Sequence, residues 1–342
     1  MPISSRLNAT AILIAVALLA LPAAAGAAVT PPPPTPLFAP TSVWNAPLAA
    51  DAPLDPAGPP LVQQLRDTVA QNLAARTGPW IATNQSGTPL YSVAWNQPRV
   101  RVQLHTGWWG DTLQTAYESV PIPTGARPGT GADAHMVVWQ TYTNTYWEFF
   151  HMRKLADGWH ADYGGAIKNV SKSAGYFSAA SWPGLSESYW GATATSLPLA
   201  GGLMRISELK AGVIPHALAL VVPYARPKTW SFPAQRTDGS SSDAAGIPEG
   251  ARFRIDPSLD LNTIQMPRMT RMMAVAVQRY GMVVTDQTGW AVGFRAEDNT
   301  PSGTDPYYGP GGLFGGLYPN DLLASFPWDR LQLVKMDLQT AP

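Results

Sequence analysis

The chain has 342 residues, a formal net charge of zero and no cysteine, and only 13% of its residues are charged. Without cysteine it has no disulfide, thiolate nucleophile or thiolate metal site. The sparse charge excludes the basic surface expected of a protein that binds nucleic acid or an anionic membrane. Neutral partners are therefore favoured. The 13 Trp and 12 Tyr residues suit the apolar faces of sugar rings, although an aromatic core would have the same composition.

The first residues predict export. Arg6 precedes an apolar run that starts at Ala11, and the small residues Ala25 and Ala27 suit signal peptidase. We predict a signal peptide at residues 1–27, a proline-rich linker at 28–40 and a single β-rich catalytic domain at 41–342. An uncleaved membrane anchor is the alternative. We expect a secreted monomer that does not attach to the membrane once the signal is removed.

Three segments have helical spacing, at residues 59–76, 205–212 and 269–281; the last two end in Gly212 and Gly281, and Ser207 is a candidate cap. Short alternating segments predict strands at residues 100–105, 135–140, 145–150, 216–223, 281–286, 290–294 and 331–336. Turns and loops, rather than regular helices, separate these strands. The pattern predicts a mainly β fold with a few helices, arranged as an antiparallel β-sandwich or a jelly-roll-like single domain.

Residues 131–165 contain three of the five histidines together with Glu148. A turn at Asn144 and the Asp157-Gly158 pair predict two hairpins, and therefore three neighbouring strands in one antiparallel sheet. Alternation places Glu148 on one face, and the remaining members of that face are His135, Val137, Trp139, Phe150 and Tyr163. A carboxyl group among aromatic residues has a raised pKa, as a general acid requires. A structural hydrogen bond is the alternative role for Glu148.

Other polar residues stand at the ends of predicted elements. Asp133 precedes His135 on the same side, and His216 begins an apolar strand after a short helix that carries Arg205. Tyr280 ends the third helix, and Asp286 ends the strand that follows it. His216 is a candidate acid or base, and a packing role in the core is the alternative. Asp286 is a candidate site residue, and a role at the start of a turn is the alternative.

We predict a glycoside hydrolase, with Glu148 as acid, Asp133 or Asp286 as its carboxylate partner, and His135 and His216 as orienting or proton-relaying groups. The residues expected to bind substrate are Trp109, Trp147, Trp190, Arg205 and Tyr280. The first alternative is a polysaccharide lyase with His and Tyr as base and acid. The second is a non-catalytic carbohydrate-binding or envelope-surface protein. The histidines lack metal-ligand spacing, and neither a metal nor a cofactor is predicted; a structural calcium is the alternative that the sequence leaves open.

Several motifs span most of the chain: FAPTSVWNAPL, DAHM, YWEFF, WGATATSLPLAGGLMRISELKAGVIPHAL, PEGARFRI and QRYGMVVTD. The chain resembles, in these motifs, a family of secreted proteins from actinobacteria and other soil bacteria that we expect to act on carbohydrates. The resemblance implies a single domain and no particular reaction. The residues that it places in recurring motifs are Asp133, His135, Glu148, Gly191, Arg205, His216, Tyr280 and Asp286.

Overall fold

Strands make up most of the regular structure, as the sequence predicts. The computed structural model describes Met1 and residues 35–84, 86–105, 111–185, 191–242, 246–299 and 304–341. Residues 33–342 form one compact unit. Within the described residues the strands pair into four sheets, and helices are few and short apart from two.

The largest sheet has six strands in the order β1-β14-β9-β13-β12-β15. Their bounds are Trp80–Ala82, Gly293–Arg295, Leu218–Val222, Met282–Gln287, Arg252–Ile255 and Leu331–Leu333. β1 is parallel to β14 and β9 is parallel to β13, whereas the other neighbours are antiparallel. This sheet is therefore mixed, and the prediction of a purely antiparallel arrangement is wrong.

The second sheet has the order β2-β4-β5-β8, with bounds Leu90–Val93, Met136–Gln140, Thr145–Phe150 and Tyr163–Lys168. The turn at Asn144 joins β4 to β5, and Val137 pairs with Glu148, so the two residues share a face as the alternation predicts. The third antiparallel strand is β8. The predicted meander is thus only partly correct, because a second hairpin interrupts it.

That hairpin is formed by β6 (Arg153–Leu155) and β7 (Gly158–Ala161), which turn at Asp157-Gly158 as predicted. It pairs with β3 (Val102–Leu104) in a separate three-stranded sheet, so His160 does not share a sheet with Glu148. The fourth sheet contains β10 (Ala225–Ser231), β11 (Ile247–Glu249) and β16 (Leu338–Thr340). A sandwich or jelly-roll arrangement of the four sheets stays a prediction.

The three predicted helices are present. α1 (Gly58–Ala75) starts with prolines in its first turn and buries Leu61, Leu65 and Val69. α3 (Ile206–Ala211) is capped by Arg205 rather than Ser207 and ends at Gly212, whose φ of 84° suits glycine. α4 (Arg268–Tyr280) ends at Gly281. The described residues also form the short helices α2 (Asp111–Gln114) and α5 (Pro319–Leu323) and the 3-10 turns η2 (Thr115–Tyr117), η3 (Val170–Lys172), η4 (Leu261–Thr263) and η6 (Trp328–Arg330).

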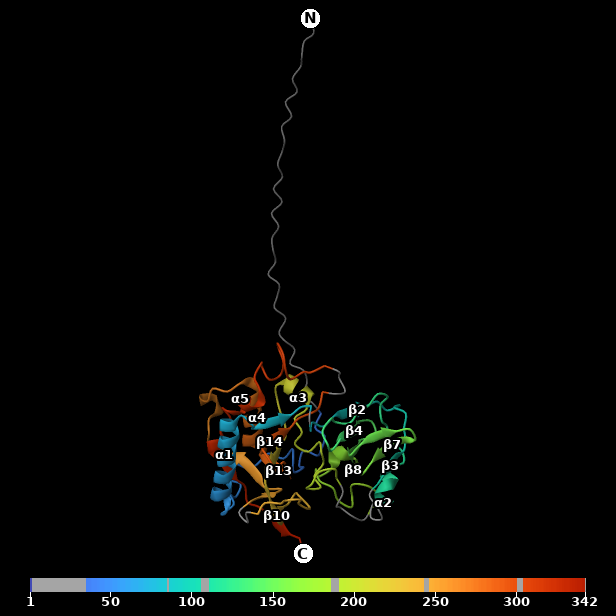
Figure 1. Ribbon diagram of the computed structural model, residues 1–342, viewed down its shortest axis with the longest axis horizontal. Coiled ribbons are helices and arrows are strands. Elements are labelled where there is room, and N and C mark those ends of the chain that lie inside the picture. Colours follow the sequence, from blue (N-terminus) through green and yellow to red (C-terminus); the bar gives the residue numbers. More distant parts are fainter. Residues whose placement is uncertain are drawn as a thin grey trace. The chain divides into compact units, whose positions relative to one another are not determined.

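Two hydrophobic cores support these sheets. One surrounds the sheet β2-β4-β5-β8 and contains Trp44, Tyr117 and Phe177, and the other lies between the six-stranded sheet and the helices α1 and α4. Figure 1 shows α1, α4 and β13 grouped on one side of this unit and β4, β7 and β8 on the other. Leu37 and Phe38 are buried in the first core, so packing begins within the segment predicted as linker. Among the described residues, none of the helices has the length and apolar composition needed to cross a bilayer.

Candidate active site

Two adjoining cavities form a cleft, because both are lined by Asp133 and Asp286. The first has a volume of about 440 Å³ and is lined by Asp133, His135, Phe150, Tyr163, residues 191–194, Arg236, Thr237, Asp238 and Asp286. The second has a volume of about 380 Å³ and is lined by Trp80, Ile81, Asn84, Ser86, Asp133, Asp286, Gln287, Thr288, Trp290, Arg295, Tyr308 and Pro319. Three predicted catalytic residues, Asp133, His135 and Asp286, thus meet at one cleft.

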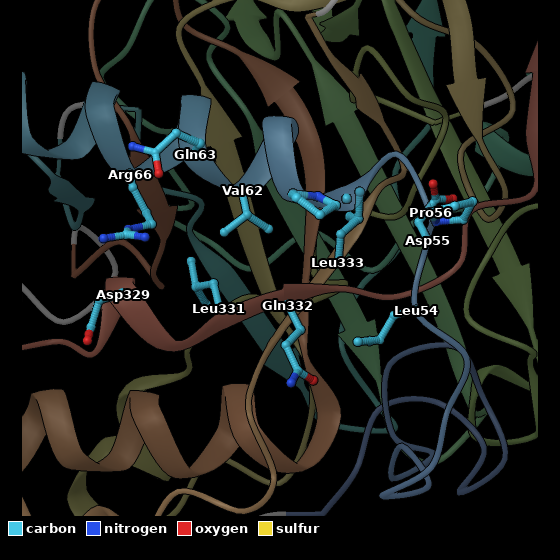
Figure 2. Close-up of a pocket in the computed structure, with 12 residues that line it drawn as sticks. Leu54, Asp55, Pro56, Val62, Gln63, Arg66, Asp329, Leu331, Gln332 and Leu333 are labelled. Carbon is cyan, nitrogen blue, oxygen red and sulfur yellow. The ribbon is translucent and has the colours of Figure 1, made fainter.

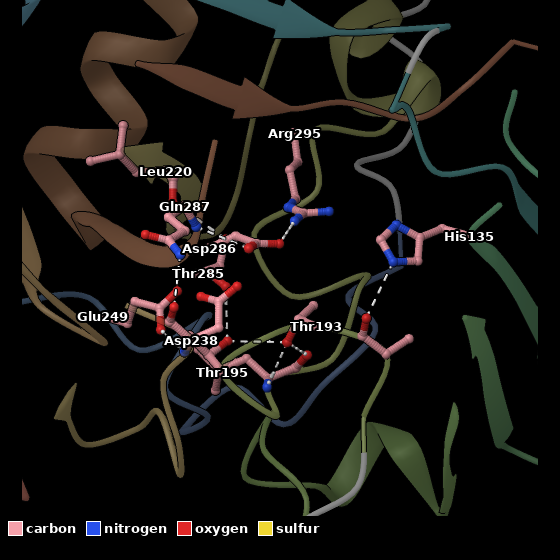
Figure 3. A network of polar contacts seen from close by, with 12 residues as sticks. His135, Thr193, Thr195, Leu220, Asp238, Glu249, Thr285, Asp286, Gln287 and Arg295 are labelled. Carbon is pink, nitrogen blue, oxygen red and sulfur yellow. Dashed lines mark hydrogen bonds and ion pairs between the residues drawn. The ribbon is translucent and has the colours of Figure 1, made fainter. Parts of the chain in front are cut away.

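The position of Asp286 depends on an irregularity in β13. The parallel register between β13 and β9 shifts between Val284 and Asp286, which pair with Leu220 and Val221 respectively. Such a bulge redirects the side chains that follow it. On the other side of β9, Arg295 ends β14 and contacts the Asp286 carboxylate, as Figure 3 shows. Burial raises the pKa of Asp286 to about 6, with Asp238 and Asp133 acting in the same direction and Arg295 opposing them.

Two further carboxyl groups lie beside Asp286. One carboxylate oxygen each of Asp238, Glu249 and Asp286 lies within 4.8 Å of the other two. Glu249 is fully buried, and one of its oxygens has no hydrogen-bond partner. Burial and the neighbouring Asp238 raise the pKa of Glu249. Oxygens of this type are what Ca²⁺ or Mg²⁺ selects, but an acidic group alone does not establish a cation site, and we assign none.

His135 stands immediately before β4 and is 4% exposed. Its Nε2 lies 3.2 Å from the carbonyl oxygen of Ala192, which can only accept, so Nε2 carries the proton in the neutral ring and Nδ1 carries the lone pair. Burial and the nearby charge of Arg295 lower the pKa of His135 to about 3. The ring is therefore neutral at physiological pH, and it can accept a proton or a hydrogen bond at Nδ1.

Residues 191–194 form one wall of the cleft, and two polar side chains, the buried Glu148 and the half-buried Arg236, hold the loop 191–199 that contains them. The Glu148 carboxylate accepts hydrogen bonds from Ala192 N at 2.5 Å, from Leu199 N at 2.7 Å and from the Tyr146 hydroxyl. The Arg236 guanidinium donates to the carbonyl oxygens of residues 191, 193 and 194 at 2.9 to 3.1 Å. Because these contacts come from two different parts of the chain, the backbone of the wall is held on both sides.

Glu148 itself does not open onto the cleft. Its residue is fully buried, and its two oxygens are taken by the three donors of the loop and of Tyr146. Burial raises the pKa of Glu148 to about 7, although hydrogen bonds from Tyr146, Ala192 and Leu199 act in the opposite direction. The predicted environment is therefore present, but the alternative role, a structural hydrogen bond, fits the geometry and direct proton donation to a substrate does not.

Arg205, Glu208 and His216 form a buried network outside the cleft. The guanidinium of Arg205 and both nitrogens of His216 face acceptors: His216 Nε2 lies 3.0 Å from Glu208 and its Nδ1 lies 2.8 Å from the Ala217 carbonyl oxygen. The imidazolium form satisfies both. Burial alone would raise the pKa of Glu208, but His216 and Arg205 lower it to about 2. Neither Arg205 nor His216 lines the two cavities of the cleft, so the structure does not bring them to Asp286.

The aromatic residues predicted to bind substrate are dispersed. Tyr280 is 8% exposed and Trp147 is 2% exposed, and both belong to the hydrophobic core around the second sheet. Trp109 and Trp190 lie outside the described residues. The cleft instead presents Trp290, which is 57% exposed and stacks on Trp80 at 5.6 Å with an interplanar angle of 9°.

Five further residues of the cleft and its wall were not predicted from the sequence: Trp80, Trp290, Arg236, Asp238 and Arg295. Asp238 stood in a segment that reads as a polar surface loop, and Arg295 follows the predicted strand at 290–294 by one residue. The position of Arg295 directly after an apolar strand is the signal from which this residue could have been predicted. The larger cavity of about 480 Å³ between α1 and β15, shown in Figure 2, contains none of the predicted site residues. No family model, no curated protein and no solved structure matches the chain.

Proposed function

We propose that this protein is a secreted polysaccharide-cleaving enzyme, a glycoside hydrolase whose substrate lies along the cleft. The observation that carries the proposal is the meeting of the two cavities at Asp133 and Asp286, next to the exposed indole of Trp290. Glycoside hydrolysis needs a carboxylic acid and a second carboxylate at the scissile bond. A flat indole beside such a pair suits the apolar face of a sugar ring.

Asp286 is the proposed general acid. Its pKa of about 6 keeps part of the population protonated at mildly acidic to neutral pH, and burial is the main cause. Asp133 is exposed at the junction of the cavities and is the proposed partner that activates water or attacks the sugar. His135, held by the Ala192 carbonyl oxygen, offers Nδ1 to a substrate hydroxyl.

The stacked pair of indoles is the proposed sugar platform. Trp80 is tied to the Ala291 carbonyl oxygen through its indole N–H at 3.3 Å, and it supports the ring of Trp290 from below. Because the supporting ring is fixed, Trp290 loses little freedom when a sugar stacks on it. This supports a binding role for the second cavity and a chemical role for the first.

The test is a screen of the purified protein against plant, fungal and mycobacterial cell-wall polysaccharides, with mass analysis of the products. On the polysaccharide that is cleaved, Asp286→Asn is expected to lower turnover by roughly 10² to 10⁴, the usual contribution of a positioned proton donor. Asp256→Asn is the matched control, since its carboxylate serves only the local turn at Ser258. Undiminished turnover in a folded Asp286→Asn protein would refute the assignment. The proposed mechanism needs a protonated Asp286, and a cation bound to this carboxylate would displace that proton. Removal of cations with EDTA is therefore expected to leave turnover unchanged.

Elimination of a uronate polysaccharide is the second candidate, favoured by one observation: His135, Tyr163 and Arg236 line the same cavity. In that reaction Nδ1 of His135 removes the proton next to the carboxylate, Tyr163 protonates the leaving oxygen, and Arg236 offsets the carboxylate charge. Tyr163 and Arg236 would replace Tyr280 and Arg205, which line neither cavity of the cleft. An unsaturated product that absorbs in the ultraviolet would identify elimination. Binding without release of reducing ends would instead support a non-catalytic carbohydrate-binding protein.

Export is part of the proposal and has its own test. The mature N-terminus is expected between Gly26 and Val29, because Ala25 and Ala27 suit signal peptidase. Sequencing the N-terminus of protein collected from the culture medium checks this. A secreted product that retains Met1 would contradict it.

A further inference from the structure

A cavity separate from the cleft lies on the other face of the sheet β2-β4-β5-β8. Successive residues of a strand point to opposite faces, so Trp147 and Glu148 of β5 face away from each other. Glu148 supports the cleft wall, whereas Trp147 lines a cavity of about 380 Å³ together with Trp182, Arg99 and Lys168. Trp182 is half-buried and is the indole that a ligand can reach, whereas Trp147 is 2% exposed and packs beside it, with the two ring centres 6.1 Å apart at 58°.

Each indole carries a cation over its ring. Lys168 Nζ lies 4.6 Å from the Trp182 ring centre, and the Arg99 guanidinium lies 5.8 Å from that of Trp147. Arg99 donates only to the neutral acceptors Ser119 O and Gln140 Oε1. None of the described residues that line this cavity is acidic, and neither cation forms an ion pair within the described part of the chain.

The remaining wall is polar but uncharged, with hydroxyl groups of Thr115, Ser119, Thr143 and Thr145 and the amide of Asn169. A ligand that fits must therefore combine a flat apolar face, several hydroxyl groups and a negative charge. A sugar ring that bears a carboxylate has all three. A purely anionic ligand would leave the indole of Trp182 unused, and a neutral sugar would leave the two cations unused.

We propose that the cavity lined by Trp147, Trp182, Arg99 and Lys168 is a second carbohydrate-binding site that takes a uronic-acid residue of an acidic polysaccharide. This second site rests on the proposed function in one respect, namely that the substrate is a polysaccharide. Its place on the opposite face of the sheet means that it holds the chain remotely from the cleavage cleft. Such a site raises the local concentration of substrate through multivalent attachment.

Calorimetric titration of the full mature protein with trigalacturonate tests the proposal, with cellotriose as the uncharged probe. Asp286→Asn is the protein used, so that cleavage does not disturb the titration. Lys168→Gln is expected to weaken trigalacturonate binding roughly three- to tenfold, and raising NaCl from about 50 mM to about 500 mM is expected to weaken it further. Trp182→Ala is expected to weaken binding of both probes, because the platform is lost.

Lys154→Gln is the matched control. Lys154 lies 5.6 Å over the ring of Trp159 in the same way, but it lines neither this cavity nor the cleft. Unchanged affinity in both Lys168→Gln and Trp182→Ala, or an equal loss in Lys154→Gln, would overturn the proposal. Lys168 is exposed, so its variant is expected to fold. Cleavage that persists in Asp286→Asn would refute only the assignment of Asp286 as general acid, since the effects of Lys168→Gln and Trp182→Ala are measured as affinities and not as turnover.

Discussion

Glu148→Gln separates a structural carboxylate from a catalytic one. A protonated carboxyl group can donate to the Tyr146 hydroxyl and still accept the N–H groups of Ala192 and Leu199, because both of its oxygens have lone pairs. The amide of glutamine has one acceptor, and its nitrogen faces a backbone N–H in either orientation. One buried donor is therefore left without a partner.

An unsatisfied buried N–H costs about 1–3 kcal/mol. For a unit of this size, that loss lowers the thermal midpoint by roughly 2 to 9 °C, using about 2–3 °C per kcal/mol. The exposed carboxylate of Glu118, which pairs with Arg101, is the control, and Glu118→Gln is expected to change the free energy of unfolding by less than about 0.5 kcal/mol.

The difference between wild type and Glu148→Gln also depends on pH. The folded pKa of Glu148, about 7, is above its unfolded value of 4.5, so its protonated form stabilises the fold fully below pH 4.5. That stability is lost as the pH rises through 7. The variant has no such titration, so the destabilisation is expected to be largest near pH 5 and to narrow above pH 7.

Thermal denaturation at pH 5 and pH 8, followed by circular dichroism, measures these differences. Turnover per folded molecule is expected to be nearly unchanged, since the carboxylate does not reach the cleft and Arg236 still holds residues 191, 193 and 194 of its wall. A variant with wild-type stability whose turnover falls by roughly 10² to 10⁴ would refute this reasoning and restore Glu148 as the general acid.

Three further changes test other parts of the structure. Gly165→Ala places a Cβ 2.2 Å from the Phe177 ring, and an unfolding free energy lowered by about 1–3 kcal/mol in urea titration is expected; no loss would show that the ring moves freely. The pKa of Glu208, about 2, is below its unfolded 4.5, so wild type is expected to lose stability as the pH falls from 4.5 towards 2. Glu208→Gln should flatten that slope, and an identical slope would contradict the network. Trp290→Ala is expected to weaken oligosaccharide binding roughly two- to tenfold with an unchanged thermal midpoint, and equal affinity would remove it from the cleft platform.

The local residue pattern was sufficient to predict the individual helices, strands and turns. The stripe of α1, the glycine that ends α4 and the Asn144 and Asp157-Gly158 turns all depend on neighbouring residues, and each is where the sequence predicts it. Alternation also placed Glu148 on a buried face correctly, because the period of a strand does not depend on its partners.

Strand partners could not be predicted in this way. The Asp157-Gly158 hairpin formed but paired with β3 instead of extending the sheet, and β8 took the place beside β5. The parallel pairs β1-β14 and β9-β13 join segments that are far apart in the chain. The local spacing of residues does not predict such pairs. Pairing is decided by which apolar faces bury one another, and this is a property of the whole fold.

The chain by itself determined that Asp133, His135 and Asp286 stand at the ends of strands, and that Glu148 lies among aromatic residues. Only the tertiary structure decided that the first three share a cleft while Glu148 is closed off by Ala192 and Leu199. The physical reason is that a carboxylate acts as an acid or as a structural acceptor according to its neighbours in space. Those neighbours come from 44 and 51 residues further along the chain, where no periodicity in the sequence connects them to Glu148.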